Sequence, residues 1–238
     1  MRRWGKTHPA FTLIELLLVI VIVALLVGMT LPGLFRARQA AYAVQCAARQ
    51  SQLIVGLSLH AHDHQDRLPY PNWKSPFSEE VHVGWLYEPP VATWERGVRM
   101  HGSLWSYTRS HDVYRCGSHR AFQEGSAQVT SFLMNGAVLA YGDQARAPRP
   151  FRIDQFRSGS AIFWDAEDIE FQSDNGVGGD RCDGATWPGI IPKARHANGI
   201  NVALIDGAVR SLSLSEYQDQ LLVRPGMLWC VPTSRTGE

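Results

Sequence analysis

An uncharged apolar segment near the N-terminus, residues 16–35, constrains this chain more than any other feature. At about 1.5 Å of rise per residue, a helix of this length spans roughly the 30 Å of a bilayer's hydrocarbon core. Arg2, Arg3 and Lys6 precede the segment and favour a cytoplasmic N-terminus. Two arginines that follow it weaken this bias without reversing it. The segment therefore predicts a membrane helix or an export signal.

Glu15 directly precedes the uncharged residues, at the start of the helix that they predict. A carboxylate inside a membrane helix costs about 2.5–3.5 kcal/mol, so such residues are usually retained for a partner. An ordinary secretory signal is the simpler alternative, but no convincing Ala-x-Ala-like cleavage site follows the apolar residues. Cleavage between Ala10 and Phe11 would instead create a positive amine one helical turn from Glu15. Desolvated together in a bundle of such helices, the two charges would fix the helix register.

The basic leader followed by FTLIELLLVIVIVALL resembles the signal of type IV prepilins and type II secretion pseudopilins. This resemblance implies cleavage after Ala10 by a membrane prepilin peptidase and N-methylation of Phe11. It also implies a filament in which Glu15 pairs with the Phe11 amine of a neighbouring subunit. The implied partners are other pilin or pseudopilin subunits and an inner-membrane assembly platform driven by a separate ATPase. The family usually has glycine where this chain has Ala10, a departure that bears on processing efficiency.

The helix is expected to continue past the membrane, over residues 36–65. Pro32 removes one backbone hydrogen bond and predicts a kink. Beyond it, small and apolar residues recur at helical spacing and predict a stripe that packs against a sheet: Ala40, Val44, Ala47, Ile54, Leu57 and Ala61. Gly56 weakens this helix by about 1 kcal/mol relative to alanine. The helix should end near His64, because prolines follow.

Residues 66–238 lose the helical period and predict a β-rich head domain outside the cytoplasm. Short apolar runs alternate with Gly, Pro, Asn and Asp, a pattern typical of an antiparallel sheet with long loops. The clearest hairpin joins residues 201–205 and 208–214 through Asp206-Gly207, a favoured pair for a two-residue type I′ turn. Weaker signals predict strands at 160–164 and 130–134. We therefore expect a pilin-like α+β fold: leader 1–10, membrane helix 11–35, amphipathic helix 36–65, and the head.

The predicted hairpin carries a second resemblance. His196, nine residues, then Asp206-Gly207 is similar to the H-x9-DG signature of prepilin-like proteins with an otherwise uncharacterised C-terminal domain. Further stretches resemble that family: Cys46 with the Gln-rich helix after it, Leu59-His60 leading to Leu68-Pro69, Tyr114-Arg115-Cys116, and Met134-Asn135-Gly136. The resemblance implies architecture more than activity. A structural role for His196 and Asp206, with hydrogen bonds across the hairpin mouth, is favoured over a ligand-binding or catalytic one.

Two groups of side chains could hold a metal. His60 and His64 lie one helical turn apart, but no third ligand accompanies them, so a polar helix end facing water is favoured. A Gly- and Asn-containing acidic segment could wrap Ca²⁺ through oxygen ligands, with candidates Asp165, Asp168, Asp174, Asp180 and Asp183. Its spacing does not match an EF-hand, so a solvated loop is favoured. No cofactor is required by either interpretation.

Four cysteines, Cys46, Cys116, Cys182 and Cys230, would all lie outside the cytoplasm on this topology. Disulfides are therefore plausible, in any of three pairings, and one bridge with two free thiols is also open. A zinc site is less favoured, because no Cys-x-x-Cys pair is present.

The composition favours a structural role for the chain. A net charge of +1 gives no nucleic-acid footprint, and none of the common hydrolase, metalloprotease or nucleotide-binding motifs occurs. We therefore expect no enzyme but a pseudopilin or minor pilin, held in the inner membrane by one span and then assembled into a filament. The alternatives are a membrane-anchored binding or metal-binding module that uses a prepilin-like leader, and an anchored hydrolase centred on His196 and Asp206.

Overall fold

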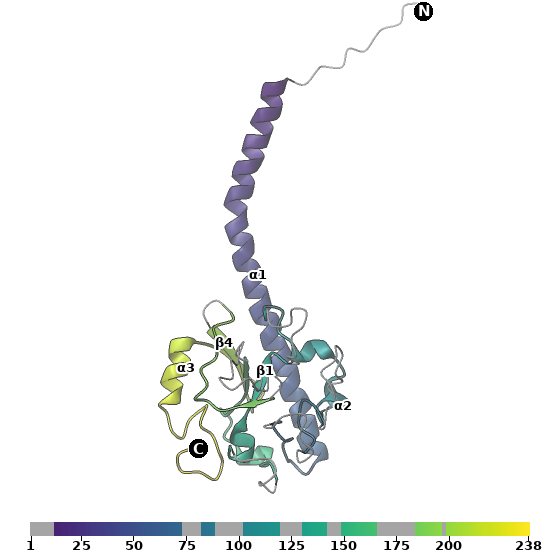
Figure 1. Ribbon diagram of the computed structural model, residues 1–238, viewed down its shortest axis with the longest axis vertical. Coiled ribbons are helices and arrows are strands. Elements are labelled where there is room, and N and C mark those ends of the chain that lie inside the picture. The colour runs from purple at the N-terminus through teal and green to yellow at the C-terminus, as the bar shows by residue number, and fades with distance from the viewer. Residues whose placement is uncertain are drawn as a thin grey trace, which may run out of the picture. The chain divides into compact units, whose positions relative to one another are not determined.

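The computed structural model describes residues 12–72, 82–88, 102–119, 130–141, 149–165, 184–196 and 199–238. The chain divides between Ala40 and Ala41 into two compact units. The long helix α1 (Leu13–Asp63) contributes residues to both units (Figure 1). Its C-terminal end at Asp63 confirms the boundary predicted near His64.

The first unit contains the apolar part of α1. Thr12 and Glu15 form a capping box at its start: Thr12 N–H donates to Glu15 Oε2 (2.9 Å), and Glu15 N–H donates to Thr12 Oγ1 (3.3 Å). The helix continues through Pro32, and its side chains are exposed as far as Ala40. Among the helices of the described residues, α1 alone has the length and apolar composition to cross a membrane, with a window of mean hydropathy 2.9.

The second unit is built on one five-stranded sheet. Its strands are β1 (Phe132–Asn135), β2 (Ala161–Asp165), β3 (Ala185–Thr186), β4 (Gly199–Leu204) and β5 (Val209–Ser213), in the order β3-β1-β2-β4-β5. Neighbours from β1 to β5 are antiparallel, as predicted, whereas β3 pairs with β1 in parallel. The sheet is therefore mixed. A parallel neighbour needs a long connection, and β2 with its flanking segments provides one between β1 and β3.

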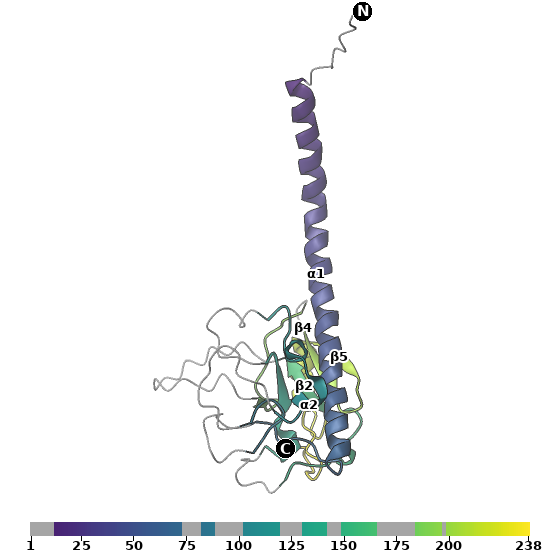
Figure 2. The same ribbon diagram turned by 90° about the vertical axis from the view of Figure 1, so that its right-hand side faces the viewer.

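Both faces of the central strands are buried, so the sheet lies inside a three-layer unit. Phe163 and Ala203 pack on one side into a cluster that contains Leu53 and Leu57 of α1. Trp164 and Val202 point to the other side, into a cluster that contains Tyr217 of α3 (Leu214–Leu221). Figure 1 shows α3 and the lower part of α1 on either side of the sheet, and Figure 2 shows that part of α1 beside β2, β4 and β5.

Short helical segments complete the second unit: α2 (Trp105–Thr108), η1 (His111–Tyr114), η3 (Gly136–Leu139) and η4 (Ile153–Gln155). The position of α2 explains why α1 has a glycine, Gly56, in its buried part. A Cβ on Gly56 would lie 3.2 Å from Thr108 Cγ2, so glycine allows α2 to approach α1 closely.

The turn of the predicted hairpin differs from the expected one. β4 and β5 do form an antiparallel pair, but the loop is three residues, Ile205 to Gly207, closed by Leu204 N–H donating to Ala208 O (2.8 Å). Gly207 has φ 93°, whereas Asp206 does not have positive φ. The two-residue type I′ prediction is therefore wrong. A type I turn followed by a left-handed glycine is used instead, and Asp206 Oδ1 accepts a hydrogen bond from Ala208 N–H (3.0 Å).

The buried stripe of α1 also differs from the predicted one. Ile54, Leu57 and Ala61 are buried as predicted, but Ala40 and Val44 are exposed and Ala47 is only half-buried. The observed stripe instead begins at Cys46 and Gln50 and continues through Leu53, Leu57 and His60, at spacings of 4, 3, 4 and 3. The apolar pattern misplaced the start of this face because its first two buried positions are a thiol and an amide.

Candidate functional site

Glu15 has a local partner within the chain. Besides the Thr12 backbone N–H, its Oε2 accepts a hydrogen bond from the Thr12 hydroxyl (2.8 Å). Ala10 and Phe11 lie outside the described residues, so processing and the pairing of Glu15 with the Phe11 amine stay predictions. The sequence interpretation missed the capping box, although the spacing Thr-x-x-Glu is its known signature.

His196 and Asp206 lie at opposite ends of β4, which has six residues. At about 3.3 Å per residue, a strand of this length separates its flanking residues by roughly 20 Å. The two side chains therefore do not meet, and Asp206 instead accepts its hydrogen bond within the turn, from Ala208 N–H. A hydrolytic centre made by these two side chains has no geometric basis, and each serves a different end of the hairpin.

His196 belongs instead to a buried polar cluster whose members come from four chain segments. Cys46 lies on α1, Cys116 follows η1, Asp165 ends β2, and His196 precedes β4. Cys116 Sγ lies 3.3 Å from His196 Nε2, and Cys46 Sγ lies 3.4 Å from Asp165 Oδ1. Asp165 Oδ2 lies 3.9 Å from His196 Nε2. The ligand atoms of the two cysteines and the histidine all lie within 4.8 Å of one another. These three side chains can hold a metal ion.

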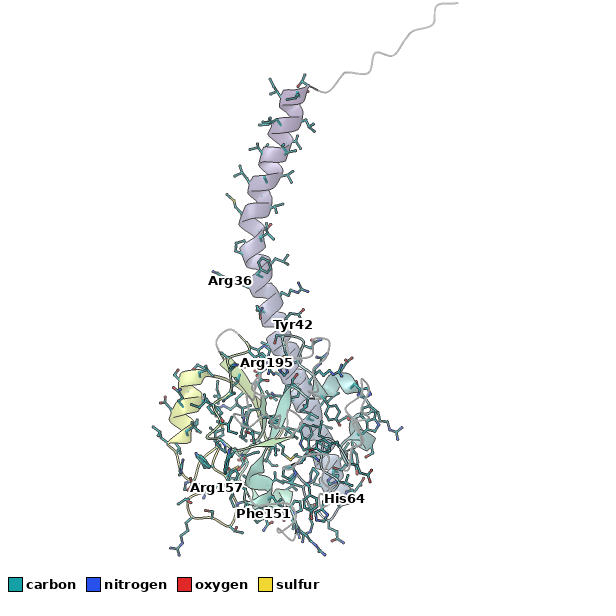
Figure 3. The ribbon with its side chains drawn as sticks, viewed as in Figure 1. Arg36, Tyr42, His64, Phe151, Arg157 and Arg195 are labelled. Carbon is teal, nitrogen blue, oxygen red and sulfur yellow. The ribbon has the colours of Figure 1, made fainter. Side chains whose placement is uncertain are left out.

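Neighbouring polar groups orient this cluster. Asp165 accepts hydrogen bonds from the Asn201 backbone N–H (2.8 Å) and from Gln50 Nε2 (3.2 Å), and Arg195 Nη1 lies 4.0 Å from its Oδ1. The Ser118 hydroxyl contacts both Cys116 Sγ (3.0 Å) and His196 Nδ1 (3.4 Å). Figure 3 labels Arg195, which lies in the second unit.

Burial and mutual hydrogen bonding set the charges of the cluster. The hydrogen bond from Cys46 lowers the pKa of the Cys116 thiol, and His196 and Ser118 lower it further. The same bond raises the pKa of Cys46, which burial and the Asp165 charge also raise. Burial raises the pKa of Asp165, against the opposing effect of Arg195. These effects favour the thiolate form at Cys116 and the neutral thiol at Cys46.

The other predicted ligands are distributed elsewhere. Cys230 is buried and separate, with Asn135 Nδ2 3.5 Å from its sulfur, and Cys182 lies outside the described residues. No disulfide joins the three described cysteines. Asp165 points into the buried cluster rather than into a solvated loop. The remaining calcium candidates, Asp168, Asp174, Asp180 and Asp183, lie outside the described residues, so that site stays a prediction.

His60 and His64 do not converge on a shared metal position. Their rings stack in parallel, with centroids 4.0 Å apart and planes 8° apart. His60 is buried and His64 is exposed. The predicted solvent-facing helix end is therefore correct for His64 and wrong for His60, whose ring is covered by the head domain.

Sequence reasoning named all four members of the buried cluster but did not group them. Cys46 and Cys116 were considered for disulfides, His196 for the hairpin, and Asp165 for calcium. One signal could have joined three of them: Cys46, Cys116 and His196 each lie in a stretch that carries the H-x9-DG resemblance. The spacing in sequence, 70 and 80 residues, hides a cluster that only the fold assembles.

Comparison with known families shows that the chain carries the prokaryotic N-terminal methylation motif, matched over residues 6–31. This match covers the leader and the first part of α1. Comparisons with curated proteins and with solved structures found no match. The leader is therefore prepilin-like, and this motif implies processing by prepilin peptidase and assembly with other pilin-like subunits.

Proposed function

We propose that this protein is a structural subunit, a pseudopilin or minor pilin, of a type IV pilus-like or type II secretion filament. The observation that carries the proposal is the coincidence of the methylation motif at residues 6–31 with an apolar, exposed helix that carries Glu15 in its first turn. Its role is mechanical rather than catalytic. The inner membrane holds the subunit before assembly, with its N-terminus in the cytoplasm and its head domain outside.

The exposed apolar side chains of α1 support this role. Large apolar residues from Leu13 to Phe35 expose between 43% and 79% of their surface. Such a surface is stable only against lipid or against other apolar helices. Lipid covers it in the membrane, and the helices of neighbouring subunits cover it in the filament core.

The head domain supports a specialised subunit rather than a major one. It is large for a major subunit, and it carries the resemblance to prepilin-like proteins with an H-x9-DG domain. We propose that it makes lateral contacts in the filament, with a cytoplasmic ATPase supplying the work of assembly.

Substitution of Glu15 tests the proposed assembly step. Glu15→Leu should insert into the membrane and be processed but fail to enter filaments, because the Phe11 amine of its neighbour would remain unpaired. Incorporation is measured by immunoblotting of sheared filaments against the membrane fraction. Glu216→Leu is the matched control, since Glu216 caps α3 with the same geometry, accepting from Ser213 N–H (2.7 Å) and the Ser213 hydroxyl (2.8 Å).

Glu15→Gln separates charge pairing from helix capping. Glutamine can still accept the Thr12 hydrogen bonds, but it cannot neutralise an amine. If pairing with Phe11 drives assembly, Glu15→Gln should fail like Glu15→Leu. Normal incorporation of Glu15→Leu would contradict the proposal as a whole, and normal incorporation of Glu15→Gln alone would assign Glu15 to the cap.

A membrane-anchored metal-binding module is the second candidate, and the cluster around Cys116 is the observation that favours it. A stoichiometric metal without filament incorporation of the wild-type chain would support this candidate. The burial of all four cluster side chains favours a metal retained within the fold over one that is exchanged or delivered.

A further inference from the structure

We propose that Cys46, Cys116, His196 and Asp165 form a structural zinc site inside the head domain. Two thiols and one imidazole already lie together as three ligands, and the adjacent Asp165 carboxylate would supply the fourth, the number that a closed structural zinc site uses. The inference concerns the folding of the head and goes beyond the proposed function, on which it does not depend.

The spacing of the four side chains fits a tetrahedral ion. With zinc bonds of about 2.3 Å to sulfur and about 2.0–2.2 Å to nitrogen or oxygen, the edges of the tetrahedron are about 3.6 Å for sulfur with nitrogen or oxygen, and about 3.4 Å for nitrogen with oxygen. The corresponding distances are 3.3 Å from Cys116 Sγ to His196 Nε2, 3.4 Å from Cys46 Sγ to Asp165 Oδ1, and 3.9 Å from His196 Nε2 to Asp165 Oδ2. Each lies within about 0.5 Å of its edge. The two Asp165 contacts use different carboxylate oxygens, so the carboxylate would have to rotate to bring one oxygen to the ion, beside the three atoms of Cys46, Cys116 and His196 that already lie within 4.8 Å of one another.

The surrounding groups act as the outer shell of a metal site. Metal-bound histidine usually gives its second ring nitrogen to a hydrogen-bond acceptor, which fixes the ring and its tautomer. Here the Ser118 hydroxyl lies 3.4 Å from His196 Nδ1 and leaves Nε2 facing the sulfur of Cys116. The Asn201 backbone N–H and Gln50 hold the Asp165 carboxylate in the same way.

A disulfide between Cys46 and Cys116 is the competing explanation for two neighbouring thiols. It would account for the two sulfurs alone. It would leave the buried Asp165 carboxylate and the buried His196 imidazole outside the bond, each beside its own polar neighbours: Arg195, the Asn201 N–H and Gln50 for Asp165, and Ser118 for His196. Zinc would use all four groups at once, and its two positive charges, together with that of Arg195 4.0 Å from Asp165 Oδ1, would balance two thiolates and the carboxylate.

The proposed ion would join four segments that are distant in the sequence. Cys46 is the first buried residue of α1, and the other three ligands come from the segment after η1, from β2 and from the segment before β4. Zinc would therefore hold the start of the buried part of α1 against the sheet. Structural zinc contributes directly to folding in small domains, and the same is expected of the head.

The test is the metal content of the full chain, purified from membranes in mild detergent without chelator and without a metal-affinity step. Elemental mass spectrometry should find about one zinc per chain. Cys116→Ser and His196→Gln should each reduce it at least fivefold. Cys230→Ser is the matched control, because Cys230 is another buried thiol outside the cluster, and it should keep the full content.

A variant that keeps a metal ligand at position 196 distinguishes loss of a ligand from misfolding of the head. His196→Cys replaces one zinc ligand by another and should restore zinc to at least half of the wild-type content. Cobalt added to the chelated wild-type chain should give the intense d–d bands of a tetrahedral site and a thiolate charge-transfer band, both absent in Cys116→Ser.

Three results would overturn the proposal. The first is wild-type chain without zinc that also fails to bind added Zn²⁺ or Co²⁺ after reduction. The second is a Cys46–Cys116 disulfide in the native chain, detected as a peptide pair that resists alkylation until reduced. The third is one equivalent of a different metal, which would overturn the assignment to zinc.

Discussion

The two parts of helix α1 have similar backbone geometry but different surroundings. Before Ala41 its side chains are exposed, and residues 16–35 are apolar on every side of the helix. After Ala41 one face is buried by the head domain and the opposite face, with Val44 and Val55, remains exposed. The first part therefore needs only a membrane or a bundle of equivalent helices, whereas the second part needs one particular partner surface. A helix that is apolar on every side suits a subunit that changes neighbours on assembly. A helix with one apolar face suits a permanent contact with one partner surface.

The largest expected effect tests the contact between the second part of α1 and the sheet of the head domain. Leu57→Ala removes a fully buried side chain between α1 and the sheet and should lower the free energy of unfolding of the head by about 2–5 kcal/mol. Val55→Ala, two residues away and 58% exposed, should change it by no more than about 0.5 kcal/mol. Urea unfolding in mild detergent, followed by the fluorescence of the buried Trp85 and Trp164, measures both. Equal effects of the two substitutions would refute the assigned buried face.

An intermediate effect comes from His60, a buried position of the same face. Burial, with the nearby His64 charge, lowers the pKa of His60 to about 4. The unfolded chain, with a pKa of about 6.5, therefore binds this proton more readily. The contribution of the neutral His60 ring to the free energy of unfolding is complete above pH 6.5. As the pH falls towards 4, the head loses about 2 kcal/mol of this stability.

Variants identify the titrating group. The loss between pH 6.5 and 4 should shrink in His60→Gln and persist in His62→Gln, because His62 is exposed on the same helix. Urea midpoints at a series of pH values provide the measurement. An unchanged pH dependence in His60→Gln would show that another group is responsible.

The smallest expected effect comes from the capping boxes of α1 and α3. Ser213→Ala removes the cap of α3 and should destabilise the head by about 1 kcal/mol. Thr12→Ala removes the equivalent cap of α1 but should leave the unfolding of the head unchanged, since residues up to Ala40 form a separate unit. A measurable loss of head stability in Thr12→Ala would show that the two units are thermodynamically coupled.

The sequence predicted those features that depend on local composition. The apolar length of residues 16–35 and the end of the helix near His64 are set by local sequence. The β4–β5 hairpin was also predicted, because its two strands are neighbours in the sequence. The turn type was missed because Asp-Gly serves both a type I′ turn and a type I turn with a left-handed glycine. The pairing of β3 with β1 was missed because Ala185-Thr186 is too short to give a strand pattern.

The grouping of the buried cluster was missed for a different reason. Cys46 and Gln50 are not strongly apolar, so the helical pattern assigned the buried face of α1 to Val44 and Ala47 instead. Asp165 was read with the acidic segment that follows it, whereas its position as the last residue of a buried strand directs it inward. Long-range clusters of this kind depend on strand register, which a single sequence does not determine.

The most direct test of the central claim is mass spectrometry of the N-terminal peptide of the protein from its own host. The proposed function predicts a mature peptide that begins at N-methylated Phe11 and retains residues 16–35. An unprocessed Met1 start, or cleavage after the apolar residues, would contradict a filament subunit built on this helix.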